Sequence, residues 1–335
     1  MKENKFICYE CEKEYEGDYY LYDDGEKYCI TCFNELFFCC NSCNNFCDRE
    51  EAIVTTDGCE ICESCYNEYF ASCESCGEID CIDDLMYDDY SYNYYCSHCY
   101  HNICQEIGMH NYNYSPDNII FYSNNESRKD NLHIGIELEI QGGDRYSFCQ
   151  EFMNEYDDDK FFYLKSDGSL DTSGVEIVSQ PMTYNYIMNT SHWEDVFKIM
   201  NSNYMDNISG CGLHFHLDKE YLTNDNIKVI DYIVNHFSEY FEEMGGRPFN
   251  GYCRKTYKSI SDWGVNTDNR YCAVNLENDN TVELRFCEST DDYDNFIKRV
   301  KLIFAIVEFA KTHSFKNTIK IKNIKKCKCF LNITF

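Results

Sequence analysis

His133-Ile134-Gly135-Ile136-Glu137-Leu138-Glu139-Ile140 is the stretch that decides the fold of the larger part of this chain. Apolar residues alternate with the others at period two, which is the pattern of a β-strand with one apolar face. The other face carries Gly135, Glu137 and Glu139. The two carboxylates lie on the same side, about 7 Å apart along the strand. Taken alone, such a pair is typical of a solvated sheet face, because charged residues are mostly exposed.

Three further stretches have the same character. Each has an apolar face and a polar face with acids, histidines or an arginine: Val175–Ser179 with Glu176, Gly212–Leu217 with His214 and His216, and Val282–Phe286 with Glu283 and Arg285. We expect the four strands to form one sheet with a polar concave side. Several carboxylates, two imidazoles and a guanidinium on one surface are typical of sites that hold hard divalent cations bridged to phosphate oxygens.

Two other interpretations of the histidine strand stay open. His214 and His216, with an acid nearby, also fit a two-histidine-one-carboxylate metal site of an oxygenase or hydrolase. The pair equally fits two satisfied core histidines, since histidine is often partly buried.

Length, composition and charge limit the function classes. A chain of 335 residues with 44% hydrophobic content is long enough for two or more domains with cores of their own. It contains no apolar run near 18 residues and no apolar signal core after Met1, so we expect neither a transmembrane helix nor secretion. The net charge of −30 opposes nucleic-acid binding. We therefore expect a protein of the reducing cytoplasm, of a cell or of a virus-infected host, with no nucleic-acid or membrane partner.

The N-terminal third contains a threefold repeat of paired Cys-x-x-Cys motifs, and the first cysteines of the repeats lie 32 and 33 residues apart. The three sets are Cys8, Cys11, Cys29 and Cys32; Cys40, Cys43, Cys62 and Cys65; and Cys73, Cys76, Cys96 and Cys99. Four thiolates at this spacing satisfy a tetrahedral zinc ion with no open position, which defines a structural site. Modules near 30 residues are too small for a core, so each zinc ion must contribute on the order of 10 kcal/mol to folding. We predict three structural zinc ions in small modules of the zinc-ribbon or LIM-like type.

Some cysteines of this region are surplus to the three sets. Cys59 forms a second Cys-x-x-Cys pair with Cys62, so the third ligand of the middle module stays open between them. The others, Cys39, Cys47 and Cys81 among them, are expected to be buried or free thiols.

The zinc region is itself acidic. Residues 1–100 hold 24 Asp and Glu residues against 5 Lys and Arg residues, and each four-thiolate zinc site adds two more negative charges. Such a surface repels nucleic acid, so we interpret the region as an arm that binds or scaffolds another protein. A non-catalytic, zinc-bearing adaptor is accordingly an alternative for the whole chain, because a fold alone never determines activity.

Further periodic patterns follow the first strand. They predict helices near residues 146–156, 193–200, 225–244 and 294–313, and a strand at 161–165 before the turn at Ser166–Ser169. Gly245-Gly246-Arg247-Pro248 ends the third of these helices. The segment 246–269 is locally basic and has no clear period, so it is either a lid over phosphates or an ordinary surface loop.

Five motifs come in an order that resembles the amidoligase family. They are Lys165-Ser-Asp-Gly-Ser169, Gly174-Val-Glu-Ile-Val-Ser-Gln-Pro181, Gly210-Cys-Gly-Leu-His-Phe-His216, Arg270-Tyr-Cys-Ala-Val-Asn275 and Thr281-Val-Glu-Leu-Arg-Phe286. That family belongs to the carboxylate–amine ligases, which share a fold with glutamine synthetase and γ-glutamylcysteine synthetase. The similarity covers about residues 132–313, and the zinc region lies outside it.

The resemblance implies an α+β fold, a curved antiparallel sheet with helices on its outer face, and an ATP-dependent ligase. The resemblance places the ligase domain in 132–315. The cysteine spacing and composition add three zinc modules in 1–104, a polar linker in 105–131, and a lysine-rich tail in 316–335 that is a final strand or lacks regular structure. The implied substrates are a carboxylate and an amine, each an amino acid, a peptide or a protein.

The resemblance also implies roles for individual residues. The implied magnesium ligands are Glu137, Glu139, Glu176, His214 and Glu283, and the implied phosphate-binding residues are Arg285, Arg270 and His216. Asp167 and Asn275 would lie nearer the substrates, and the catalytic set would be Glu137, Glu139, Asp167 and Arg285. Phosphoryl transfer from ATP turns a poorly electrophilic carboxylate into an acyl phosphate, which requires metal-bound phosphates, a positive group and a base for the amine.

Overall fold

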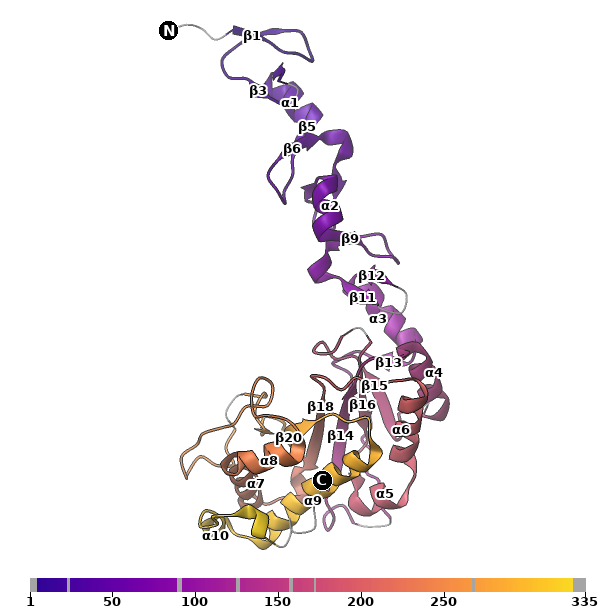
Figure 1. Ribbon diagram of the computed structural model, residues 1–335, viewed down its shortest axis with the longest axis vertical. Coiled ribbons are helices and arrows are strands. Elements are labelled where there is room, and N and C mark those ends of the chain that lie inside the picture. The colour runs from indigo at the N-terminus through magenta and orange to yellow at the C-terminus, as the bar shows by residue number, and fades with distance from the viewer. Residues whose placement is uncertain are drawn as a thin grey trace. The chain divides into compact units, whose positions relative to one another are not determined.

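The computed structural model describes residues 5–22, 25–88, 92–124, 127–156, 159–171, 173–266 and 269–327. The chain divides into two compact units, Met1–Asn102 and Ile103–Phe335 (Figure 1). Within the described ranges, no helix combines the length and apolar character that crossing a membrane would require.

The first unit repeats one arrangement three times, with two short antiparallel hairpins followed by a helix. Its elements are β1 (Lys5–Ile7), β2 (Glu14–Glu16), β3 (Tyr20–Leu21), β4 (Lys27–Tyr28) and α1 (Ile30–Leu36); β5 (Phe37–Cys39), β6 (Phe46–Asp48), β7 (Ile53–Val54), β8 (Glu60–Ile61) and α2 (Glu63–Tyr69); and β9 (Phe70–Ser72), β10 (Ile79–Cys81), β11 (Met86–Asp88), β12 (Asn93–Tyr95) and α3 (Ser97–Glu106). Their apolar cores are very small. In the first repeat the core at the cysteines consists of Phe6 with Cys8, Cys29 and Cys32. Such modules cannot bury enough apolar surface to fold by packing alone.

The second unit is built on one sheet with the strand order β13-β15-β16-β14-β18-β20-β19, and β17 pairs with β14. The strands are β13 (Met109–His110), β14 (His133–Ile140), β15 (Phe162–Lys165), β16 (Val175–Ser179), β17 (Met182–Thr183), β18 (Gly212–Asp218), β19 (Val274–Asn275) and β20 (Thr281–Glu288). The four strands expected to share a sheet are therefore neighbours in it. Every pairing is antiparallel except that of β13 with β15. β13 comes from the polar stretch 105–131.

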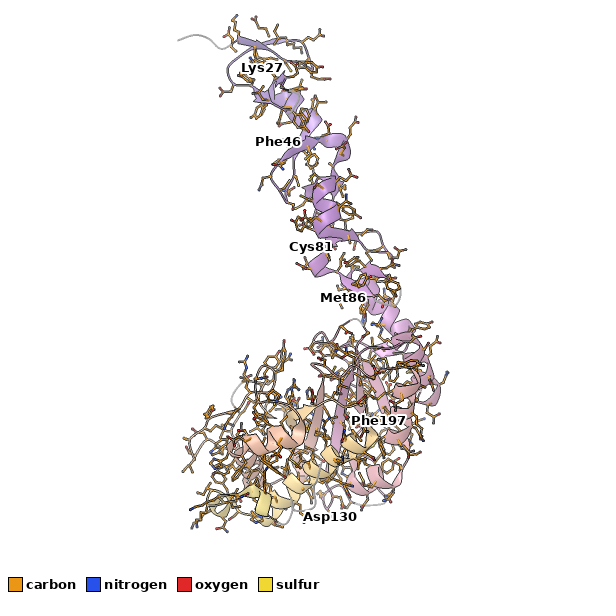
Figure 2. The ribbon with its side chains drawn as sticks, viewed as in Figure 1. Lys27, Phe46, Cys81, Met86, Asp130 and Phe197 are labelled. Carbon is orange, nitrogen blue, oxygen red and sulfur yellow. The ribbon has the colours of Figure 1, made fainter. Side chains whose placement is uncertain are left out.

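Helices cover the apolar face of this sheet. They are α4 (Arg145–Glu155), α5 (Tyr184–Asn189), α6 (His192–Ser202), α7 (Asn224–His236), α8 (Ser238–Gly245), α9 (Tyr293–Thr312) and α10 (Phe315–Thr318), and α8 and α9 lie over the strands in Figure 1. On the sheet, Ile136 and Leu284 are fully buried. Phe197, labelled in Figure 2, packs against Phe296 of α9, and their ring centroids are 5.2 Å apart. The mixed α+β architecture is thus as expected.

Two expectations about the helices need correction. The pattern at 225–244 predicted one helix, but the chain forms α7 and α8 with a break at Phe237 (φ −103°, ψ 37°). Asn235 and Ser238 flank the break, and both are poor helix formers because their side chains bond elsewhere. Asn235 accepts a hydrogen bond from the Thr256 backbone, and Ser238 accepts one from Lys255.

The second correction concerns the C-terminal tail. Its described part contains α10 and a short 3-10 helix (Ile324–Lys326), so the alternative of a strand is wrong there. Residues 328–335 lie outside the described part of the chain.

Candidate functional site

Strand register assembles the polar face of the sheet from residues that are far apart in the chain. One row runs Lys165, Glu176, Glu139 across β15, β16 and β14. A second row runs Gly135, His216, Glu283, Asn275 across β14, β18, β20 and β19, and Glu137 lies opposite His214 between the two rows. Side chains opposite one another on the same face of a sheet are about 4.5–5.5 Å apart at Cβ, so these groups interact directly.

All ten residues expected in the ligase site line a single cavity of about 680 Å³ over this face. They are Glu137, Glu139, Asp167, Glu176, His214, His216, Arg270, Asn275, Glu283 and Arg285. Most of the acids are buried, while Arg270 is exposed. The structure therefore brings the whole expected set together.

Glu137 and the two histidines form the centre of the cavity. Glu137 Oε1 lies 3.2 Å from His216 Nε2, and Glu137 Oε2 lies 3.4 Å from His214 Nδ1. Burial opposes ionisation of Glu137, but the neighbouring imidazoles outweigh it and hold its pKa well below the usual range. Burial also opposes protonation of His216, yet the charge of Glu137 raises the pKa of this histidine to about 9. The Glu137 carboxylate is consequently ionised at neutral pH.

Glu176 and Glu139 form a second acidic patch beside it. Lys165 Nζ lies 3.2 Å from Glu176 Oε2, and the Gly212 backbone N–H donates a hydrogen bond to Glu139. Burial, together with the charge of Glu137, raises the pKa of Glu176 to about 8, although Lys165 lowers it. Burial likewise raises the pKa of Glu139. The patch therefore resists full ionisation, which would place more negative charge there than its single lysine neutralises.

Glu283 is held in place by one residue of the adjacent strand β19 and one residue of its own strand. Asn275 donates a hydrogen bond to Glu283 Oε2 at 2.7 Å, and Arg285 donates one to Glu283 Oε1. Burial opposes ionisation, but the charges of His216 and Arg285 lower the pKa of Glu283. The Arg285 guanidinium also donates to the Tyr252 carbonyl at 3.4 Å.

Two groups of side chains could each hold a cation. Glu137, His214 and Glu283 each offer a ligand atom within 4.8 Å of the others, and so do Glu139, Asp167 and Glu176. The donor chemistry fits: hard divalent cations prefer carboxylate oxygens. Moreover, among the described residues no hydrogen-bond partner reaches the buried Nε2 of His214, which lies 3.9 Å from Glu139 Oε1. A bound ion or water molecule would satisfy this buried nitrogen.

The structure adds lining residues to the ten expected ones, and two of them, Arg247 and Tyr252, come from the basic segment 246–269. Lys165 enters the cavity through its ion pair with Glu176, and Arg247 lines the wall near the Arg285 carbonyl at 3.5 Å. Tyr112, Tyr252 and Tyr271 line it as well. The lysine belongs to a quoted motif, but only the pairing of β15 with β16 shows which acid it contacts.

The basic loop after α8 is anchored rather than free. Lys258 Nζ lies 2.7 Å from Asp231 Oδ2, and the Gly264 N–H donates to the same oxygen at 2.9 Å. Asp231 is fully buried in α7. The backbone of Arg254 also forms an isolated parallel β-bridge with that of Cys272, next to β19. These bonds favour a fixed wall over a mobile lid.

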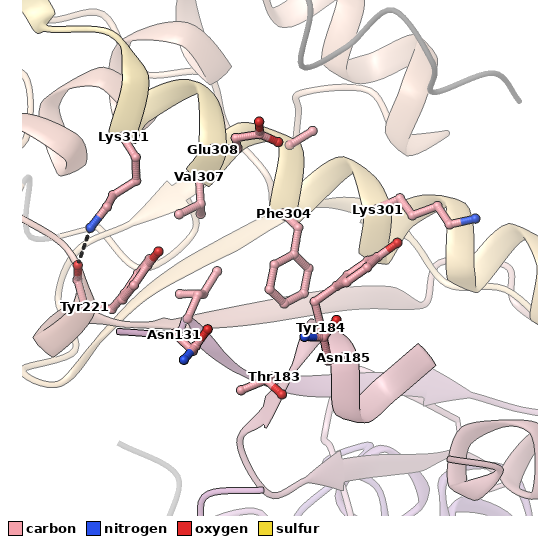
Figure 3. Close-up of a pocket in the computed structure, with 12 residues that line it drawn as sticks. Asn131, Thr183, Tyr184, Asn185, Tyr221, Lys301, Phe304, Val307, Glu308 and Lys311 are labelled. Atoms are coloured by element: carbon pink, nitrogen blue, oxygen red, sulfur yellow. Dashed lines mark hydrogen bonds between the residues drawn. The ribbon is translucent and has the colours of Figure 1, made fainter. Parts of the chain in front are cut away.

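A second cavity of about 540 Å³ lies between α9 and residues near β17 (Figure 3). On one side, Lys311 Nζ donates a hydrogen bond to the Tyr221 carbonyl at 3.4 Å. The Phe304 side chain lies in the middle of the lining residues. None of the ten expected site residues is among those that line it.

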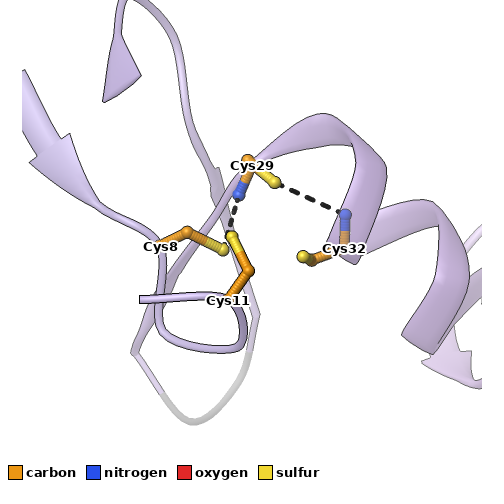
Figure 4. A group of neighbouring side chains, drawn as sticks. All are labelled: Cys8, Cys11, Cys29 and Cys32. Carbon is orange, nitrogen blue, oxygen red and sulfur yellow. Dashed lines mark hydrogen bonds between the residues drawn. The ribbon is translucent and has the colours of Figure 1, made fainter. Parts of the chain in front are cut away.

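The three expected cysteine groups are present in the first unit. In each, the four sulfurs lie within 4.8 Å of one another, so each group could hold a zinc ion. Figure 4 shows the first group, where the Cys29 N–H donates to Cys8 Sγ at 3.3 Å. The Cys62 N–H does the same to Cys40 Sγ at 3.4 Å. Among the described cysteines it is Cys62, and not Cys59, that completes the middle group.

Backbone hydrogen bonds prepare these sulfurs for a metal. Burial opposes ionisation of Cys40 and Cys73, but the N–H groups of the surrounding turns lower the pKa of each thiol to about 6. A thiolate is the form that binds zinc. The donor set and its environment therefore fit structural zinc.

No family model matches this chain, and no curated protein matches it.

Proposed function

We propose that the second unit is an ATP- and Mg²⁺-dependent carboxylate–amine ligase that forms an amide bond through an acyl phosphate. The observation that carries this proposal is the cavity on the polar face of the sheet, where two groups of side chains that could each hold a cation share the lining with Arg247, Arg270 and Arg285. Such a combination serves reactions in which charge develops on a transferring phosphoryl group. The proposed substrates are a carboxylate and an amine of an amino acid, peptide or protein.

In this proposal the acids hold the cations. Glu137, His214 and Glu283 would hold one Mg²⁺ ion, and Glu139, Asp167 and Glu176 another. Bound Mg²⁺ neutralises and orients phosphate oxygens. Asp167 thus belongs with the cation ligands as well as near the substrates.

The basic residues act on the phosphates. Arg285 is already oriented by Glu283 and the Tyr252 carbonyl, so little conformational entropy is lost when its guanidinium meets an anion. Arg247 and Arg270 lie elsewhere on the cavity wall and can neutralise the remaining charge. His216, with a pKa of about 9, supplies a further positive group at neutral pH.

The geometry gives less support to an oxygenase or hydrolase. The cation group at the centre contains one histidine and two carboxylates, and among the described residues His216 does not join it. A two-histidine-one-carboxylate triad requires the opposite ratio. A pair of purely structural core histidines fits less well, because both line the cavity.

Nucleotide turnover separates the ligase from its alternatives. Purified full-length protein is incubated with ATP and Mg²⁺, and ADP release is measured with and without pooled carboxylates and amines. The ligase releases ADP only with Mg²⁺ and faster with both substrates present. An oxygenase would need Fe²⁺ and oxygen and ignore ATP, and an adaptor would release no ADP under any condition.

A further inference from the structure

Three residues occupy the same place in the three cysteine repeats. Tyr15, Cys47 and Asp80 each follow the first cysteine of their set by seven residues. Each also pairs, across its first hairpin, with the residue two positions before that cysteine: Tyr15 with Phe6, Cys47 with Phe38, and Asp80 with Ala71. The position is thus equivalent by strand register and not only by sequence.

In the first repeat this position faces the sulfurs. The Tyr15 hydroxyl lies 3.6 Å from Cys11 Sγ, and its ring packs against the cluster of Phe6, Cys8, Cys29 and Cys32. A side chain at this point of the hairpin therefore reaches the metal-binding group. In the third repeat the equivalent residue is Asp80, which is half-buried.

In the middle repeat the same position is a fifth thiol. Cys47 is half-buried and packs against the cluster that contains Phe38, Cys40, Ile61 and Cys65. Burial, together with the charge and a hydrogen bond of Cys62, raises the pKa of Cys47 to about 11. Cys47 thus places a further sulfur beside those of the middle set.

The four primary sulfurs of this repeat differ in exposure. Cys40 and Cys65 are buried, whereas Cys43 is exposed and Cys62 half-buried. Oxidants and alkylating agents reach the accessible thiols first. Cys62, whose charge acts on Cys47, is thus one of the two accessible thiols of the set and can be lost.

We propose that Cys47 is a reserve zinc ligand of the middle module, which takes the place of Cys62 when that thiolate is removed or modified. In the exchange the Cys62 sulfur–zinc bond breaks, the Cys47 thiol releases its proton to solvent, and a Cys47 sulfur–zinc bond forms. The modules with Tyr15 and Asp80 have no thiol at this position and no such reserve. The inference rests on zinc binding by the cysteine groups and is independent of the proposed ligase activity.

The test counts zinc that survives a chelator. Full-length Cys62→Ala is compared with Cys62→Ala/Cys47→Ala, at a chelator concentration that leaves the wild type fully loaded. We expect about three zinc ions per chain in the single variant and about two in the double variant. A matched control, Cys62→Ala/Cys39→Ala, removes an exposed cysteine of the same hairpin and should keep about three.

Equivalent changes in the first module, which has no cysteine at this position, serve as a comparison. Cys29→Ala should fall to about two zinc ions, whereas Tyr15→Cys/Cys29→Ala should return to about three. Equal zinc contents in Cys62→Ala and Cys62→Ala/Cys47→Ala would overturn the proposal. Retention of all zinc by Cys29→Ala would overturn it too, because a reserve ligand would then be unnecessary.

Discussion

The two units of this chain reach a defined structure by different routes. In the first, small clusters join cysteines to a few apolar side chains, as where Cys8, Cys29 and Cys32 pack with Phe6, and a separate cluster of Tyr28, Phe33 and Phe37 contains no cysteine. In the second, a large apolar layer stabilises the sheet and leaves its other face free for charged side chains. The difference shows that cysteine groups belong to the small cores of the first unit, whereas the side-chain groups that could hold a cation in the second unit lie outside its apolar core.

Zinc removal is expected to have the largest effect, because it should unfold one unit and not the other. A strong chelator should unfold the first unit, since each site contributes on the order of 10 kcal/mol to folding. The second unit should remain folded, because its core contains no part of the cysteine groups. Hydrogen exchange followed by mass spectrometry checks this: amides in residues 5–88 should lose protection, while those of β14 and β18 keep it. Equal loss in both units would contradict the separation.

A pair of neighbouring substitutions on β20 sharpens the distinction between its two faces. Leu284 is fully buried in the apolar layer, so Leu284→Ala should cost about 2–5 kcal/mol of unfolding free energy. Glu283→Gln should leave the fold intact and weaken Mg²⁺ binding, because the residue faces the cavity. Urea denaturation measures the first effect and metal titration the second. If Leu284 is the tolerant position, the assigned faces of the strand are wrong.

Arg285→Lys tests the chemistry assigned to the polar face. The substitution keeps the positive charge but loses the planar fork that bonds Glu283 and Tyr252. Losing a contact that strengthens in the transition state should slow ADP release roughly 100-fold. Steady-state kinetics of the full-length variant provide the measurement. Normal turnover would remove Arg285 from the proposed mechanism.

The smallest expected effect concerns the start of α7. Thr223 and Asn226 form a capping box, so Thr223→Ala should lower the unfolding free energy by about 1 kcal/mol. Ser314 at the start of α10 makes no side-chain cap bond, and Ser314→Ala is the matched control with a change of at most a few tenths of a kcal/mol. Urea denaturation of the zinc-loaded variants compares the two. Equal losses would show that capping does not explain the difference.

The two units also differ in how far their structure could be predicted from the sequence. Cysteine spacing is local, so the three four-cysteine groups follow from it directly, and only the choice between Cys59 and Cys62 needed the structure. The strands β14, β16, β18 and β20 follow from alternation over five or more residues. By contrast, β13 and β19 contain two residues each, which is too short for any period to show.

The remaining features depend on contacts between distant segments. The ion pair of Lys165 with Glu176 requires the register of β15 and β16, which no local pattern specifies. The break at Phe237 is hidden because apolar residues continue at helical spacing through it. Asn235 and Ser238 are instead used by the loop at Lys255 and Thr256.

Titration of the full-length protein with ATP, with and without Mg²⁺, tests the central proposal most directly. The account predicts heat of binding at about one site per chain when Mg²⁺ is present. It predicts strongly weakened binding without Mg²⁺, because the carboxylates of the cavity then repel the phosphates. It also predicts a loss of Mg²⁺-dependent binding in Glu137→Gln. Absence of ATP binding under both conditions, in protein whose second unit is folded, would contradict the proposed ligase site.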